Sequence, residues 1–255
     1  MSRPARFAYL EHDGLLAFAH RGGAGDYPEN SMHAFEAAVK LGYRYIETDA
    51  YATRDGVLLS FHDDRLDRVT DKQGAIEELD YAQVRDARID GSEPIPLMED
   101  LLGSFPDTRF NIDPKHDSAV APLIEVIRRT NAVERVGIGS FSGKRLTQMR
   151  DTLGPKLCTS VGPWDALRVR LAAYGLPTGG FSRPGCVQFP EKQWGIPLVD
   201  ADTVALCHSH DLQVHVWTID EPQDMNRLID LGVDGLMTDR PAVLKEVLQA
   251  RGLWA

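Results

Sequence analysis

Residues 19–64, AHRGGAGDYPENSMHAFEAAVKLGYRYIETDAYATRDGVLLSFHDD, hold the pattern that decides the fold of this chain. An apolar run ends here in His-Arg, and a glycine-rich loop and a helical pattern follow. A second apolar run then ends in Glu-x-Asp, and a hairpin leads to His-Asp-Asp. The ionisable side chains therefore fall at the ends of predicted strands or in the loops after them, which is where an α/β barrel carries its catalytic groups.

The first half of this stretch predicts a strand, a tight turn and a helix. Residues 15–19 form a short apolar run typical of a strand that is buried on both faces. Gly22 lies in a Gly-rich loop that lets the backbone turn sharply and leaves room for a ligand near the main chain. Either Asn30 or Ser31 can cap the following helix, which is expected to end at Leu41-Gly42.

The second half predicts two carboxylates and a histidine at one place. Residues two apart on a strand share a face, so Glu47 and Asp49 should project together. Two neighbouring carboxylates repel each other unless a cation lies between them. Asp55-Gly56 indicates a hairpin turn, and the returning strand 57–61 brings His62 back towards the acids. The pattern suggests acid/base chemistry on an anionic substrate that is bound through a metal ion.

Strand and helix patterns alternate through the remainder of the chain, which favours parallel strands in a closed (β/α)8 TIM barrel. We found no internal repeat and no second domain, so residues 1–255 are predicted to form one domain. The expected strands lie at 109–113, 135–140, 156–160, 185–189, 213–217 and 235–237. The expected helices lie at 98–102, 119–129, 144–153, 164–174, 202–210, 222–230 and 241–250.

Composition and charge narrow the class of protein. The chain has 255 residues, of which 43% are hydrophobic and 26% charged, as is usual for a soluble enzyme. A formal net charge of −10 argues against a nucleic-acid partner. No apolar run approaches the ~20 residues of a membrane span, and the first residues do not read as a signal peptide. The three cysteines are widely spaced, which fits reduced thiols. The cytoplasm is the expected location, and the oligomeric state is left open.

The ordered motifs HRG, PEN, Glu-x-Asp and His-Asp resemble the signature of the glycerophosphodiester phosphodiesterase family. Later segments agree with it, namely Asn111-Ile112-Asp113-Pro114-Lys115, Gly139-Ser140-Phe141, Trp217-Thr218, Gly232-Val233-Asp234-Gly235 and Thr238-Asp239-Arg240-Pro241. The similarity extends over about residues 15–245. It implies a barrel that hydrolyses glycerophosphodiesters to sn-glycerol 3-phosphate and an alcohol, in lipid and glycerol metabolism. Residues 63–106, which lack a regular alternation, would form a small insertion that caps the barrel mouth. Most of the charges in that insertion are expected to be solvated.

A metal site is the first prediction about the chemistry. Asp113 ends a predicted strand and should face the same mouth as Glu47 and Asp49. Three carboxylates without a nearby cysteine suit one hard divalent cation, Mg²⁺ or Ca²⁺. The family most often has glutamate at the position that matches Asp113, and the shorter aspartate places its oxygen about one methylene farther back. The alternative is that the three acids only pair with basic side chains, namely Arg44, Arg109 or Lys115.

The other candidate residues follow from the same resemblance. His20 and His62 would be the acid/base pair, since imidazole titrates near neutral pH. Arg21 and Lys115 would bind the phosphate and stabilise charge in the transition state, although salt bridges of these two residues to Glu29 or Asp113 are also possible. Phe141 and Trp217 would wall the pocket for the alcohol. Glu29 and Asn30 would brace Arg21 and cap the helix.

Several alternatives stay open at this level. The phosphodiester could be attacked by the substrate's own glycerol hydroxyl, giving a cyclic phosphate, or directly by metal-bound water. A lysophospholipase D or sphingomyelinase D-like activity is a related possibility. A non-catalytic barrel that binds a phosphate ligand belongs to a different class, which the loss of a histidine or carboxylate would have indicated.

Overall fold

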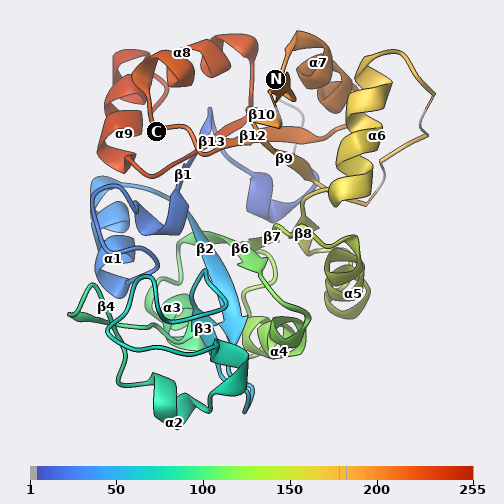
Figure 1. Ribbon diagram of the computed structural model, residues 1–255. Helices are drawn as coiled ribbons and strands as arrows, with labels where there is room; N and C mark the ends of the chain where they lie inside the picture. The colour runs from blue at the N-terminus through green and yellow to red at the C-terminus, as the bar shows by residue number, and fades with distance from the viewer. Residues whose placement is uncertain (1–4, 178, 182, 194, 255) are drawn as a thin grey trace.

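The computed structural model describes residues 5–177, 179–181, 183–193 and 195–254 and shows a parallel barrel surrounded by helices (Figure 1). Among these residues, eight parallel strands hydrogen-bond in the order β8-β7-β6-β2-β1-β13-β12-β9. The barrel closes between β8 and β9 through a parallel bridge of Ser160 with Cys186. The predicted TIM barrel is therefore confirmed. The strands are β1 (Leu16–Ala19), β2 (Tyr45–Ala52), β6 (Arg109–Pro114), β7 (Val136–Ile138), β8 (Cys158–Thr159), β9 (Cys186–Pro190), β12 (Gln213–Trp217) and β13 (Gly235–Thr238).

The helices lie close to their predicted positions, and their ends differ from the prediction by a few residues. None of the helices in the described part of the chain has the length and apolar character that crossing a bilayer requires. The α-helices of the barrel are α1 (Met32–Leu41), α3 (Met98–Ser104), α4 (Val120–Arg129), α5 (Gly143–Leu153), α6 (Pro163–Ala173), α7 (Ala201–Ser209), α8 (Pro222–Leu231) and α9 (Pro241–Ala250), and short 3-10 turns occur at η1 (Ala8–Leu10), η2 (His20–Gly22) and η4 (Asp117–Ala119).

The structure decides which residue caps α1. The Ser31 hydroxyl accepts a hydrogen bond from the Ala34 amide at 3.1 Å, and Gly42 ends the helix in the left-handed conformation with φ of 98°. Asn30 does not cap the helix, because its side chain faces the barrel interior and donates to Asp49. The expectation that Asn30 helps to cap the helix is therefore wrong.

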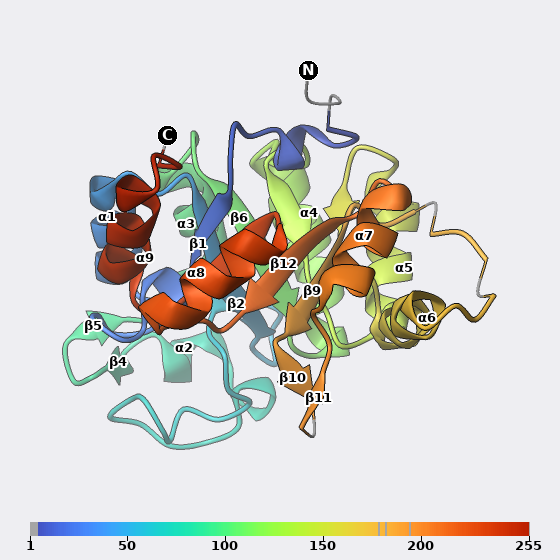
Figure 2. The same cartoon turned by 90° about the horizontal axis from the view of Figure 1, so that it is seen from above.

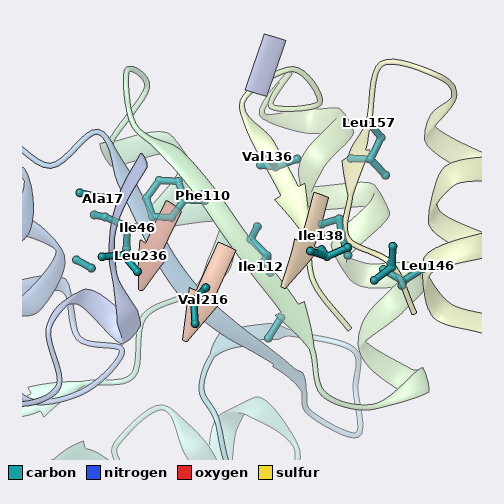
Figure 3. Packing of buried hydrophobic residues seen from close by; sticks show 14 of the residues in the cluster. Ala17, Ile46, Phe110, Ile112, Val136, Ile138, Leu146, Leu157, Val216 and Leu236 are labelled. Atoms are coloured by element: carbon teal, nitrogen blue, oxygen red, sulfur yellow. The ribbon is translucent and has the colours of Figure 1, made fainter. Parts of the chain in front are cut away.

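Alternation along the strands separates an outer core from the barrel interior. Ile46 belongs to the large cluster between strands and helices, whereas its neighbour Tyr45 belongs to an inner cluster closed by Tyr9 of η1. Figure 3 shows members of the outer cluster, including Phe110, Ile138 and Leu146. Each fully buried side chain of this size contributes about 1.5–3 kcal/mol to stability. Since side chains alternate, Glu47 and Asp49 have the same parity as Tyr45 and point into the barrel mouth.

The chain between β2 and α3 forms an insertion with its own small core. It contains β3 (Leu58–Ser60), which is antiparallel to β2, and then η3 (Ile76–Glu78), α2 (Tyr81–Val84), β4 (Arg88–Ile89) and β5 (Glu93–Pro94). Its apolar residues, among them Leu66 and Ile76, form a cluster separate from the barrel core, whereas Leu101 of α3 belongs to the barrel core. The insertion and the hairpin of β10 (Lys192–Gln193) and β11 (Ile196–Pro197) lie at the same end of the barrel, away from the chain termini (Figure 2).

Candidate active site

The acidic residues meet at the carboxyl ends of two neighbouring strands. In the pairing of β2 with β6, Asp49 lies directly opposite Asp113, and Glu47 lies opposite Asn111. Glu47 and Asp49 are almost completely buried, with 5% and 1% of their surface exposed. The predicted convergence of Glu47, Asp49 and Asp113 at the barrel mouth follows from this register.

A strained turn places His20 and Arg21 beside these acids. Arg21 has a left-handed backbone with φ of 51°, which costs a non-glycine residue about 1–3 kcal/mol. Its amide donates to Glu47 Oε2 at 3.0 Å, and this contact holds the turn against β2. Gly22 packs so tightly that an added Cβ would lie 2.8 Å from the Cβ of Ala34. Glycine is required here for the close approach of the turn to α1.

His20 lies between two carboxylates. Its Nδ1 is 2.7 Å from Asp239 Oδ1, and its Nε2 is 3.7 Å from Glu47 Oε2. A carboxylate accepts hydrogen bonds, so Nδ1 carries the proton that points to Asp239 and Nε2 faces the site. Burial lowers the pKa of His20, but Glu47 and Asp239 outweigh it and the pKa is raised. Asp239 thereby fixes the orientation of the imidazole and stabilises its protonated form.

Asp239→Asn is expected to lower kcat about tenfold, because the amide can present its NH2 group to Nδ1 and turn the imidazole or change its tautomer. Steady-state kinetics with a glycerophosphodiester, the substrate class that the resemblance implies, would measure the effect. Asp234→Asn is a matched control, since Asp234 pairs with His208 at 2.9 Å in a His-Asp contact just before β13 begins. An Asp239→Asn enzyme with the kinetics of this control would contradict the role of Asp239.

Two cationic side chains neutralise part of the acidic cluster. Lys115 Nζ lies 2.8 Å from Asp49 Oδ1 and 2.9 Å from Asp113 Oδ2. Arg21 Nε lies 3.4 Å from Asp49 Oδ2, and Asn30 Nδ2 donates to the same oxygen at 2.9 Å. Burial would raise the pKa of Asp49, but Lys115 and Arg21 outweigh it and hold that pKa below its usual value. Arg21 and Lys115, which are predicted to bind the phosphate, therefore both form salt bridges with carboxylates.

The negative charge of Glu47 is less well compensated by neighbouring cations than that of Asp49. Burial, together with the charge of Asp49, raises the pKa of Glu47 to about 7. Burial likewise raises the pKa of Asp113, even though Lys115 opposes this shift. A hard divalent cation would stabilise both groups as carboxylates, so the chemistry of these oxygen donors fits Mg²⁺ or Ca²⁺. Among the described residues, however, no three His, Cys, Asp or Glu side chains already have the spacing of a metal site.

His62 reaches the same mouth from the insertion side. The amide of its neighbour Phe61 donates to the Asp49 carbonyl at 3.1 Å, and the charge of His62 contributes to the lowered pKa of Asp49. His62 Nδ1 lies 2.6 Å from Asp63 Oδ1. Each of the two predicted acid/base histidines thus has its Nδ1 on an aspartate, so Nε2 is the ring nitrogen left for proton transfer.

The predicted aromatic residues are in contact with each other. The rings of Phe141 and Trp217 meet edge to face with centroids 5.9 Å apart, and Phe141 is 71% exposed. Both residues follow or end strands at the carboxyl end of the barrel. Arg109, by contrast, binds the Glu11 carbonyl at 2.9 Å and does not join the acidic cluster.

Three residues of the site were not assigned from the sequence. Asp239 directly follows β13, so its position at a strand end was a usable signal. Asp63 stands next to His62, and that adjacency was also visible in the sequence. Arg68 binds Asp63 and Glu29, but it lies among the charges that we expected to be solvated. Only the path of the insertion brings Arg68 to the barrel mouth.

The fold and site define a TIM-barrel enzyme with a histidine pair, a carboxylate cluster and cationic side chains at one mouth, and the comparisons specify its family. The model of the glycerophosphoryl diester phosphodiesterase family matches residues 20–243. The protein named probable glycerophosphodiester phosphodiesterase 2 of Mycobacterium tuberculosis is 44% identical, covering 96% of this chain and 95% of that protein. Human lysophospholipase D GDPD1 is 27% identical, covering 90% of this chain and 85% of that protein.

A solved structure agrees with the fold. The Oleispira antarctica phosphodiesterase in complex with its product sn-glycerol-3-phosphate superposes with a TM-score of 0.76 at 19% identity, covering 92% of this chain and 97% of that one. The chain described here belongs to the glycerophosphoryl diester phosphodiesterase family. It is therefore a phosphoric diester hydrolase, and the alternative of a non-catalytic binding barrel is set aside.

Proposed function

We propose that this enzyme hydrolyses glycerophosphodiesters to sn-glycerol 3-phosphate and an alcohol by acid/base catalysis with His20 and His62. The observation that carries the proposal is the pair of Asp-anchored histidines: Nδ1 of His20 is 2.7 Å from Asp239, and Nδ1 of His62 is 2.6 Å from Asp63. An imidazole held in this way presents Nε2 as a proton donor or acceptor near neutral pH. The two histidines would serve the attacking and leaving oxygens in turn.

The phosphate group would lie between the cationic side chains. Arg21 offers a planar fork to phosphate oxygens, and Lys115 offers a compact charge. Both side chains are anchored by carboxylates, so little side-chain entropy is lost when the substrate binds. Phe141 and Trp217 are proposed to wall the pocket for the alcohol. The cytoplasmic location remains a prediction.

The proposed cofactor is one divalent cation, Mg²⁺ or Ca²⁺, held by Glu47, Asp49 and Asp113. The raised pKa values of Glu47 and Asp113 support it, because they indicate negative charge that the protein has not fully compensated. When bound, such an ion would polarise the phosphoryl oxygens and neutralise charge that develops during displacement.

We favour attack by the substrate's own glycerol hydroxyl. One histidine removes the proton of this hydroxyl, its oxygen bonds to phosphorus, and the bond to the alcohol breaks as the other histidine protonates the leaving oxygen. Water then opens the cyclic phosphate with the two proton-transfer roles reversed, which yields sn-glycerol 3-phosphate. The proposed positions of two independent proton-transfer groups at one mouth suit both steps.

A substrate analogue without the neighbouring hydroxyl tests this route, and we expect no detectable turnover of it. The assay would compare release of choline from glycerophosphocholine, from its deoxy analogue and from intact lysophosphatidylcholine. Normal turnover of the analogue would overturn the cyclic route in favour of direct attack by water. Choline release from lysophosphatidylcholine, but not from glycerophosphocholine, would instead support the lysophospholipase D alternative. The similarity to human lysophospholipase D GDPD1 favours testing this alternative.

A further inference from the structure

Arg68 joins two carboxylates at the edge of the barrel mouth. It lies in the insertion, between β3 and η3, and its guanidinium forms a fork with each acid. Nε and Nη2 donate to Asp63 at 2.5 and 3.0 Å, while Nη1 and Nη2 donate to Glu29 at 2.9 and 2.6 Å. The two hydrogen bonds to Glu29 connect the insertion to the loop after β1, and the two to Asp63 lie within the insertion.

Each of these carboxylates holds a different residue of the proposed machinery. Asp63 Oδ1 binds His62 Nδ1 at 2.6 Å, and Glu29 Oε1 accepts a hydrogen bond from Arg21 Nη1 at 3.0 Å. Arg68 is therefore one contact away from a proposed proton-transfer group and one contact away from a proposed phosphate ligand. Movement of Arg68 would release both carboxylates at the same time.

The setting distinguishes this cluster from an ordinary surface ion pair. Isolated exposed pairs contribute little to stability, because water screens them and both side chains lose entropy. Arg68 is half exposed, but the Asp63 and Glu29 side chains are only 20% and 14% exposed. Burial opposes ionisation of Asp63, yet hydrogen bonds from Arg68 and His62 outweigh it and lower the pKa of Asp63 to about 2. Two forked contacts also fix geometry better than a single contact can.

We propose that Arg68 is a positioning residue that sets the orientation of His62 through Asp63 and that of Arg21 through Glu29. The insertion is then part of the catalytic unit and more than a cover over the mouth. This inference rests on the proposed function, since it takes His62 and Arg21 as groups that act on the substrate.

The two branches predict different kinetic effects. Asp63→Asn disturbs only the His62 branch and is expected to lower kcat about tenfold with little change in KM. Glu29→Gln disturbs only the Arg21 branch and is expected to raise KM about tenfold with little change in kcat. Arg68→Gln disturbs both branches and should show both effects. In the double variant of Arg68→Gln with Asp63→Asn, kcat should fall no further than in Asp63→Asn alone, because both changes act on one branch.

The insertion provides a matched control. Arg54 makes the same kind of forked contact with Asp80, with Nε and Nη2 at 2.9 and 2.6 Å from the carboxylate, but this pair does not touch the site. Arg54→Gln should therefore keep wild-type kcat and KM. Thermal unfolding of Arg54→Gln and Arg68→Gln would show whether any loss of activity follows from stability. Arg68→Lys keeps the charge without the fork, so we expect an intermediate loss in both constants.

The outcomes of these kinetic measurements would decide whether Arg68 is a positioning residue. The inference would be supported if Asp63→Asn lowered mainly kcat and Glu29→Gln raised mainly KM. It would also be supported if the effects on kcat in the double variant were not additive. Arg68→Gln kinetics like those of Arg54→Gln, or losses that multiply in the double variant, would overturn it. His62→Ala distinguishes the two levels of the proposal. Wild-type turnover of that variant would refute the proposed function, whereas an inactive His62→Ala with a fully active Arg68→Gln would refute only the positioning role.

Discussion

His62→Ala is expected to reduce the release of glycerol 3-phosphate from glycerophosphocholine by about 10²–10⁴-fold, the usual contribution of a positioned acid or base. The imidazole is the only group that this substitution removes from the mouth, since Asp63 stays bound to Arg68 at 2.5 Å. The methyl side chain of alanine can neither accept nor donate a proton. A coupled assay of glycerol 3-phosphate under substrate saturation would give the change in kcat.

His208→Ala is the matched control for this variant. His208 also binds an aspartate, with Nε2 2.9 Å from Asp234 Oδ2, but the pair lies beside the start of β13 and away from the carboxylate cluster. We expect wild-type kinetics from this control. Equal rates of the wild type and His62→Ala would refute the catalytic assignment of His62.

Removal of divalent cations is expected to lower activity at least about 100-fold, with recovery on addition of Mg²⁺ or Ca²⁺. The physical reason is that burial raises the pKa values of Glu47 and Asp113, so a bound cation would stabilise their ionised forms. Activity after treatment with a chelator, followed by titration with each cation, would measure the dependence and show which ion serves better.

Thermal unfolding provides a readout of cation binding that does not depend on turnover. A cation at 100 times its Kd stabilises the folded state by about 2.7 kcal/mol, so the unfolding temperature should rise with cation concentration. Glu47→Gln keeps a side chain of similar size but removes its charge, and it should abolish most of this rise. Full activity with chelator present and no cation-dependent shift would exclude the proposed cofactor.

The barrel could be predicted from the sequence because the patterns that indicate it are local. Alternating strand and helix patterns require no knowledge of distant contacts, and strand parity alone places Glu47 and Asp49 on one face. Strand ends were harder to predict. The strand expected at 135–140 extends only over Val136–Ile138, since few residues of β7 pair with both neighbours.

The residues that meet at the site could be predicted from the sequence, but the hydrogen bonds and salt bridges between them could not. The sequence placed His20, Glu47, Asp49 and Asp113 at one mouth, because parallel strands of a barrel end together. The hairpin turn at Asp55-Gly56 predicted the return of His62 to the same mouth. The sequence could not show that Lys115 bridges Asp49 and Asp113, since the direction of a long side chain depends on its surroundings.

Asp239 and Arg68 illustrate what only the tertiary structure decided. Asp239 is 219 residues from His20 in sequence, and the closure of β13 against β1 makes them neighbours. Arg68 reaches Glu29, 39 residues away, because the small core around Leu66 and Ile76 folds the insertion back over the mouth. Local periodicity in the sequence thus determined the scaffold, and the strand ends together with the family resemblance predicted which groups act on the substrate. Packing between distant segments decided which partners orient those groups.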